Sequence, residues 1–239
     1  MKIVVTIEAD LGRYRDEFRL PLHLRFVEDD MLTICWAAKG GSGTTVYAVA
    51  RALAITTPTV LVDLAGDAMT VLGLPRPDSP GIHDWLRSDA GPDRLARLEH
   101  PATELLSVVP AGRHDPERGG RRWFELGAHL RTEPRRVIVD AGTGRPPDAL
   151  VAAADESLLV TRACYLALTR AGELGARPTG IVVVEEPGRR LGSADIEASL
   201  GAPIVATALL DPAIARAVDA GLLVSRLPSA WRRQLRRAA

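Results

Sequence analysis

Lysine is nearly absent from this chain. Of its 30 lysine and arginine residues, only Lys2 and Lys39 are lysine, so a lysine at a given place stands out from an arginine background.

Cysteine is equally scarce. Cys35 and Cys164 lie in apolar stretches without the spacing of metal ligands, which is typical of ordinary core residues. The thiols therefore give no reason to expect a metal centre.

The chain also lacks an excess of charge of either sign and any long apolar run. Its net charge is zero, so no overall field favours nucleic acid. No apolar run approaches the roughly 18 residues of a membrane span, and the N-terminus lacks the layout of a signal peptide. With 239 residues, 46% apolar and 25% charged, we expect a cytoplasmic globular protein of one domain, or one domain with a small appendage.

What the chain does contain is a glycine-rich stretch between a predicted strand (32–37) and a predicted helix (44–55). Glycines let the backbone curl so that N–H groups converge, and the helix N-terminus adds positive potential, which suits a phosphate chain. The phosphate-loop pattern places lysine and then serine or threonine after the last glycine. Here Thr45 supplies the hydroxyl, but Thr44 stands where the lysine belongs. The candidate nucleotide-binding residues are Lys39, Gly40, Gly41, Ser42, Gly43, Thr44 and Thr45.

From Met31 onward, predicted strands and helices alternate, which indicates an α/β fold with a doubly wound, mostly parallel sheet. Residues 1–30 precede this pattern and are predicted to form a short N-terminal β-hairpin appendage. Residues 66–80 and 113–120 are predicted to be loops. Strands are expected at 32–37, 59–63, 104–110, 136–140, 157–161, 179–184 and 203–206, and helices at 44–55, 82–88, 92–100, 121–132, 147–154, 165–174, 193–200 and 212–220.

The glycine-rich stretch, Asp63 and Asp140 all fall at the carboxyl ends of predicted strands, where ligands bind in sheets of this kind. The stretch 39–45 resembles the deviant Walker A loop, KGGxGK[ST], of the MinD/ParA family of P-loop ATPases (SIMIBI type). Six of the seven motif positions match. The resemblance covers about residues 31–228. It implies binding of ATP or ADP with Mg²⁺ and a homodimer in which Lys39 reaches the partner's nucleotide.

The resemblance also assigns roles to three polar residues as candidate Mg²⁺ ligands. Thr45 would bind the ion directly, and Asp140 matches the Walker B aspartate that holds a water on Mg²⁺. The alternative for Asp140 is a turn-forming residue before Ala141. Asp63 resembles the acid that begins switch I. The resemblance further places Asp211 and Pro212 in the adenine-side loop, whereas Val184-Glu-Glu186 stands where relatives read adenine with asparagine, which leaves base preference open.

Two catalytic parts of the family are missing together. Thr44 replaces the lysine of the loop, and Ala65 replaces the acid that positions the attacking water, unless a shifted loop lets Asp67 serve instead. Phosphoryl transfer depends on charge near the phosphate oxygens and on an oriented nucleophile. We therefore expect little or no hydrolysis. The loss of the lysine resembles the TadZ and septum-site-determining branch, whose members position pilus or division machinery.

The last segment, 229–239, is a basic tail in which Trp231 and Leu235 would share one helix face. The favoured interpretation is a helix with Trp231 docked on the body, and the alternative is a marginal, peripheral contact with a membrane or with nucleic acid.

The leading functional hypothesis is a nucleotide-responsive dimer that positions or regulates an unknown partner protein, in division, partitioning or pilus placement. The alternatives are a nucleotide-free scaffold and a weak ATPase of the partitioning type.

Overall fold

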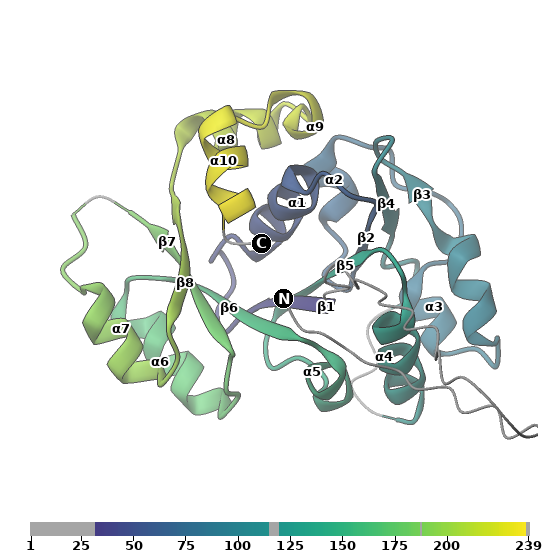
Figure 1. Cartoon of the computed structure of the whole chain (residues 1–239), viewed down its shortest axis with the longest axis horizontal. Coiled ribbons are helices and arrows are strands. Elements are labelled where there is room, and N and C mark those ends of the chain that lie inside the picture. The colour runs from purple at the N-terminus through teal and green to yellow at the C-terminus, as the bar shows by residue number, and fades with distance from the viewer. Residues whose placement is uncertain (1–31, 115–119, 187, 238–239) are drawn as a thin grey trace, which may run out of the picture.

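A single sheet forms the centre of the computed structural model, which describes residues 32–114, 120–186 and 188–237 (Figure 1). Its strand order is β3-β4-β2-β5-β1-β6-β7-β8, and every neighbouring pair is parallel except β3 and β4. The strands are β1 (Leu32–Ala37), β2 (Thr59–Asp63), β3 (His100–Pro101), β4 (Leu106–Val109), β5 (Arg136–Thr143), β6 (Glu156–Arg162), β7 (Gly180–Glu185) and β8 (Ile204–Leu209).

Helices cover both faces of the sheet (Figure 1). One layer holds α1, α2, α8, α9 and α10, and the other holds α3 to α7 together with the 3-10 helix η1. The predicted doubly wound, mostly parallel α/β fold is confirmed. The helices are α1 (Thr44–Ala54), α2 (Ala68–Leu72), α3 (Ile82–Leu86), η1 (Pro92–Leu98), α4 (Arg122–Thr132), α5 (Asp148–Ala153), α6 (Tyr165–Leu174), α7 (Ser193–Leu200), α8 (Pro212–Asp219), α9 (Leu223–Arg226) and α10 (Ser229–Arg237).

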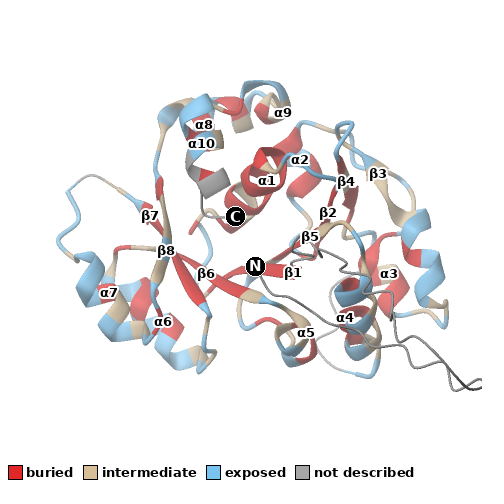
Figure 2. Cartoon of the chain, in the orientation of Figure 1, coloured by how far each residue is buried: buried red, intermediate tan, exposed pale blue. Residues whose placement is uncertain are grey.

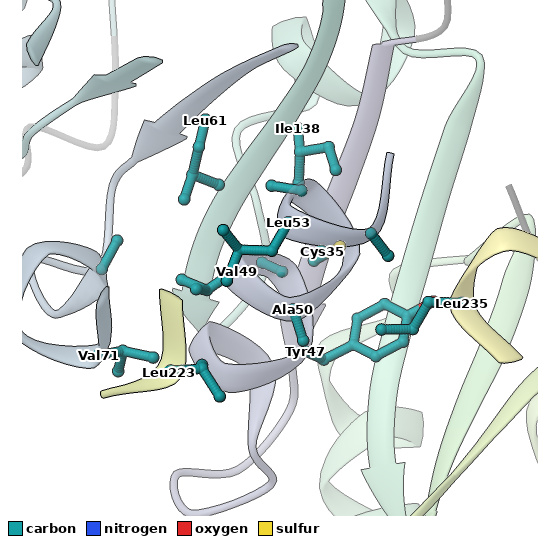
Figure 3. Close-up of a cluster of buried hydrophobic side chains, with 14 of the residues drawn as sticks. Cys35, Tyr47, Val49, Ala50, Leu53, Leu61, Val71, Ile138, Leu223 and Leu235 are labelled. Carbon is teal, nitrogen blue, oxygen red and sulfur yellow. The ribbon is translucent and has the colours of Figure 1, made fainter. Parts of the chain in front are cut away.

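The central strand β1 is buried along its whole length, and its alternating side chains feed two cores (Figure 2). Ile34 and Trp36 pack toward α3, α4 and α5, and the Trp36 indole donates to Ser157 Oγ at 3.0 Å. Cys35 faces the other way, into the core around α1 (Figure 3). Because α1 follows the glycine-rich loop directly, this packing fixes where the loop stands.

Most predicted elements are present, with four main differences, one of which is the unpredicted short helix α9. The stretch 66–80, predicted to be a loop, contains α2, whose apolar residues join the core around α1. A two-residue strand, β3, pairs antiparallel with β4 where a helix end was predicted. Strand β5 continues beyond Asp140 to Thr143. The predicted hairpin at 1–30 lies outside the described residues.

The C-terminal segment folds back onto the body as α10. Trp231 and Leu235 are buried in the core around α1, and Figure 3 shows Leu235 beside Tyr47 of α1. The Arg232 guanidinium donates to the Leu53 carbonyl at 3.1 Å. This agrees with the docked interpretation of the tail. Within the described ranges, every helix is too short or too polar to cross a membrane.

Candidate functional site

The glycine-rich loop curls between the end of β1 and the start of α1. Gly41 and Gly43 have φ values of 74° and 88°, a left-handed conformation that glycine adopts without steric cost. Gly43 is the N-cap of α1, and its carbonyl accepts the first helical hydrogen bond, from the Tyr47 N–H at 2.9 Å. Ser42 Oγ donates to the Lys39 carbonyl at 2.8 Å and closes the turn. The loop therefore has the backbone shape that the motif predicts.

A cavity of about 910 Å³ opens beside this loop. The loop after β2, the start of α4 and the segment between β5 and α5 complete its wall. Its size is in the range of small-molecule sites, and it lies beyond the carboxyl ends of β1, β2 and β5. Its lining residues include Gly40, Gly41, Ser42, Gly43, Thr44, Thr45, Ala65, Asp67, Trp123, Thr143, Arg145 and Asp148.

Asp140 ends the buried part of β5, immediately behind the loop, and its side chain is fully buried. Burial raises the pKa of Asp140 to about 7; the Thr45 hydroxyl beside it lowers the pKa, whereas the charge of Asp63 raises it further. One oxygen, Oδ1, accepts from the Gly142 N–H at 3.1 Å. The other, Oδ2, accepts no hydrogen bond of normal geometry from the residues that the structure describes.

The surroundings of the Asp140 carboxylate are suited to a bound metal ion. A buried carboxyl oxygen without a donor gains from a nearby cation, and the neighbouring Thr45 hydroxyl and Asp140 together match the hard oxygen donors that Mg²⁺ prefers. No group of three or more histidine, cysteine, aspartate or glutamate side chains in the described ranges could hold a metal on its own. The residues present therefore fit Mg²⁺ that arrives with a phosphate ligand.

Asp63 lies at the end of β2, next to Asp140 in the sheet register. Its carboxylate accepts hydrogen bonds from the backbone of the segment that follows β2. Its Oδ1 accepts from the N–H groups of Ala65 and Gly66, and its Oδ2 accepts from the Ala68 N–H at 3.0 Å. Burial raises the pKa of Asp63, while these N–H groups lower it. Asp63 does not line the cavity beside the loop, and its contacts fit a loop anchor at least as well as the predicted metal ligand.

The remaining predicted site residues divide into two groups. Lys39 is exposed, and its ammonium donates to the Gly40 carbonyl of its own chain at 3.1 Å. Asp211 and Pro212 follow β8 at the same edge of the sheet, where Asp211 Oδ1 caps α8 by accepting from the Ala213 N–H at 2.7 Å. Neither Asp211 nor Pro212 lines the cavity.

The two replaced catalytic positions both face the cavity. Thr44 is 6% exposed, and Ala65 is exposed at the rim. Asp67 also lines the cavity and pairs with Arg76 at 3.3 Å, with both side chains about two-thirds exposed. The site therefore has backbone N–H groups and a hydroxyl, but neither a charge at position 44 nor an acid at position 65.

Two cavity residues were missed by the sequence reasoning. Trp123, at the start of α4, is buried and gives the cavity an aromatic wall. Arg145 lies between β5 and α5, five residues after Asp140. Its place in a loop after a strand-end acid was a usable signal for a ligand contact, whereas nothing in the sequence around Trp123 points toward the cavity.

The chain is similar to solved structures of MinD and ParA ATPases. A ParA family ATPase from Chlorobium tepidum TLS superposes with a TM-score of 0.69 at 21% identity, over 86% of this chain and 96% of that one. MinD in the Aquifex aeolicus MinC:MinD complex gives 0.69 at 18%, over 87% and 94%. Septum site-determining protein MinD with Mg-ADP from Pyrococcus horikoshii OT3 gives 0.68 at 19%, over 87% and 93%. No protein-family profile and no curated protein sequence matches. The fold is that of the MinD/ParA P-loop ATPases.

Proposed function

We propose that this chain binds MgATP or MgADP and acts as a nucleotide-responsive homodimer that positions or regulates a partner protein, with little or no ATP hydrolysis. The observation that carries the proposal is the curled loop 39–45 on a cavity with the buried, donor-poor carboxylate of Asp140 behind it. Backbone N–H groups and a hydroxyl in that arrangement suit a phosphate chain.

In this proposal, Thr45 and Asp140 would hold Mg²⁺, which would neutralise phosphate charge when bound. The adenine side is assigned to Asp211 and Pro212, which begin α8 at the same sheet edge. The proposed division of the chain is an N-terminal appendage at 1–30, a core domain at 31–228 and a basic C-terminal tail at 229–239. A Mg-ADP complex of the Pyrococcus horikoshii neighbour supports the nucleotide assignment.

Slow or absent hydrolysis follows from two side chains. Thr44 brings no positive charge to the phosphates, and Ala65 brings no group that could orient a water. Losing one preorganised charge contact in a catalytic site typically lowers the rate by about 10²- to 10³-fold. Binding is less affected because the backbone of the loop still supplies its donors.

The positioning role rests on the fold shared with the MinD/ParA ATPases, and the Aquifex aeolicus neighbour was solved with MinC as its partner. Cell division and partitioning are the processes that this likeness suggests, and pilus placement is suggested by the sequence resemblance to the TadZ branch alone. A homodimer joined across the nucleotide edge gives Lys39, which is exposed at that edge, a role beyond its own loop.

Calorimetry with MgATP and MgADP tests the proposal, with Asp140→Asn as the matched variant. We expect binding near micromolar affinity or weaker in the parent, dependence on Mg²⁺, and a weaker Mg²⁺ effect in Asp140→Asn. No heat from either nucleotide at millimolar concentration would favour the nucleotide-free scaffold. Phosphate release at the rate of active relatives would instead favour the partitioning ATPase.

A further inference from the structure

The charged side chains that line the cavity all belong to segments outside the glycine-rich loop. Among the described residues that line it, Arg145 is the one lysine or arginine, and the acids Asp67 and Asp148 line it as well. A nucleoside triphosphate would bring several negative charges into this space, and the Thr44 side chain has no positive charge to balance them. The cavity therefore has a single basic side chain of its own.

Backbone contacts fasten the segment that carries Arg145 to the start of the glycine-rich loop. The Gly144 N–H donates to the Ala37 carbonyl at 2.8 Å. A Cβ placed on Gly40 would lie 4.0 Å from Thr143 Oγ1, so the two segments are neighbours. Two prolines, 146 and 147, follow Arg145 and restrict the backbone. The guanidinium is thus carried on a short, tethered segment beside the loop that would hold the phosphates.

The present partner of Arg145 is a weak competitor for an anionic ligand. Nε and Nη2 both donate to Asp148 Oδ1, at 3.1 and 2.7 Å, and Nη1 has no hydrogen bond within the described part of the chain. The two side chains are 50% and 78% exposed, so solvent screens the pair and its contribution to stability is small. A phosphate offers more charge and more acceptor oxygens, and the planar guanidinium can bind two of them at once.

We propose that Arg145 binds the phosphate chain of the nucleotide and supplies the positive charge that Thr44 does not, with Asp148 holding the guanidinium at the cavity until the nucleotide enters. This inference rests on the proposed nucleotide binding. In this site, the basic side chain that binds the phosphates would come from the segment after β5. It would not come from the start of the helix that follows the glycine-rich loop.

Calorimetric titration of the full chain with MgATP, and separately with magnesium pyrophosphate, tests the assignment. Arg145→Ala should weaken both ligands by about tenfold or more, the usual effect of losing a hydrogen bond to a charged group. Arg145→Lys should recover part of the affinity, because it keeps the charge but not the bidentate geometry. Asp148→Ala should bind at least as tightly as the parent, because its guanidinium is released.

The matched control is Arg170→Ala on α6. Arg170 pairs with Glu173 at 2.9 Å with the same i,i+3 spacing and similar exposure, but it does not line the cavity, so its loss should leave both affinities unchanged. The double variant Arg145→Ala with Asp148→Ala should stay weak. Its return to parental affinity would place the effect in a newly unpaired Asp148 and overturn the assignment.

The possible failures are distinguishable. A parent that binds MgATP and an Arg145→Ala variant within twofold of it would refute the role of Arg145 and leave the proposed function standing. An equal loss in Arg170→Ala would refute it too, because the effect would then be one of net charge. A parent that binds neither MgATP nor pyrophosphate would remove the proposed function, and this inference with it.

Discussion

Burial of the Asp140 carboxyl group disfavours its ionised form. Its pKa is raised from an ordinary value of 3.8 to about 7, chiefly by burial, so below pH 7 the folded protein keeps this group protonated. Folded Asp140 binds its proton more tightly than the unfolded chain does. Its contribution to stability is therefore greatest below about pH 4 and declines as the pH rises toward 7.

Asp140→Asn should stabilise the ligand-free protein in a pH-dependent way, because the amide cannot ionise. The gain in the free energy of unfolding should grow by about 1 kcal/mol per pH unit between pH 4 and 7, and then level off. Urea denaturation at pH 5, 6 and 8 measures it. Asp148→Asn, which alters an exposed acid, is the control and should show no such trend. An equal gain at pH 5 and pH 8 would contradict the pKa assignment.

Two positions that face the cavity, Thr44 and Ala65, would limit any ATP hydrolysis in the proposed function. Thr44→Lys restores a charge near the phosphates but leaves the attacking water unpositioned, because Ala65 has no acidic group. Thr44→Lys with Ala65→Asp should therefore release phosphate faster than either single variant, measured with a coupled phosphate assay. A single Thr44→Lys as fast as the double variant would show that position 65 does not limit the reaction.

Among the elements, α10 packs against α1, the helix that follows the glycine-rich loop. Trp231 and Leu235 are 7% and 3% exposed against α1 and its neighbours. A membrane contact through the same two side chains would require α10 to leave this position. We therefore expect the parent not to float with anionic vesicles, and stable flotation would support the membrane alternative.

Trp231→Ala should lower the free energy of unfolding by about 3 to 5 kcal/mol, the usual range for removing a large buried aromatic side chain. Urea denaturation followed by circular dichroism measures this without depending on tryptophan fluorescence. The neighbouring Arg233 is exposed, and Arg233→Ala should change stability by less than about 0.5 kcal/mol. Similar small effects in both variants would mean that α10 is not held on the body in solution.

Elements with a strong hydrophobic period were predictable from sequence, and short ones held by tertiary contacts were not. β1 and β2 have the predicted bounds because they are buried along their whole length, and α6 has them with Ala167, Leu168 and Ala171 buried on one face. α7 also has the predicted bounds, although Ile196 is its one buried residue. In contrast, α2 is five residues long and sits among glycine and proline, where its packing on α1 overrides a local preference for loop. β3 contains a proline and survives as an edge strand.

The site divides in the same way. The shape of the loop and the position of Asp140 followed from glycines and from a strand-end acid, which are local signals. The three N–H contacts of Asp63 and the presence of Arg145 in the cavity depend on how a loop closes, and sequence spacing does not determine that. Asp63 illustrates the difference, because the same strand-end carboxylate can hold a metal or hold a turn.

On the scale of the whole molecule, substitution of Lys39 tests the proposed dimer, in which two copies meet at the glycine-rich loop. In one copy its ammonium reaches only the Gly40 carbonyl within the described chain, and it is exposed, so Lys39→Ala should leave the monomer as stable as the parent. If the ammonium contacts the partner's phosphates, the variant should lose the MgATP-dependent dimer. Size-exclusion chromatography with light scattering, with and without MgATP, measures this. A normal ATP response in Lys39→Ala would remove the cross-dimer role.

The central place of β1 has a further consequence for synthesis on the ribosome. Leu32 pairs with Val137 on one side, and Thr33 pairs with Glu156 on the other, so both partner strands are made more than a hundred residues later. At about 5 to 20 residues per second, a strand that is fully buried in the native fold waits on the order of 5 to 20 s before either neighbour exists. During that interval the nascent chain presents an unprotected, aggregation-prone segment, and a chaperone that binds extended apolar peptides would find its substrate there.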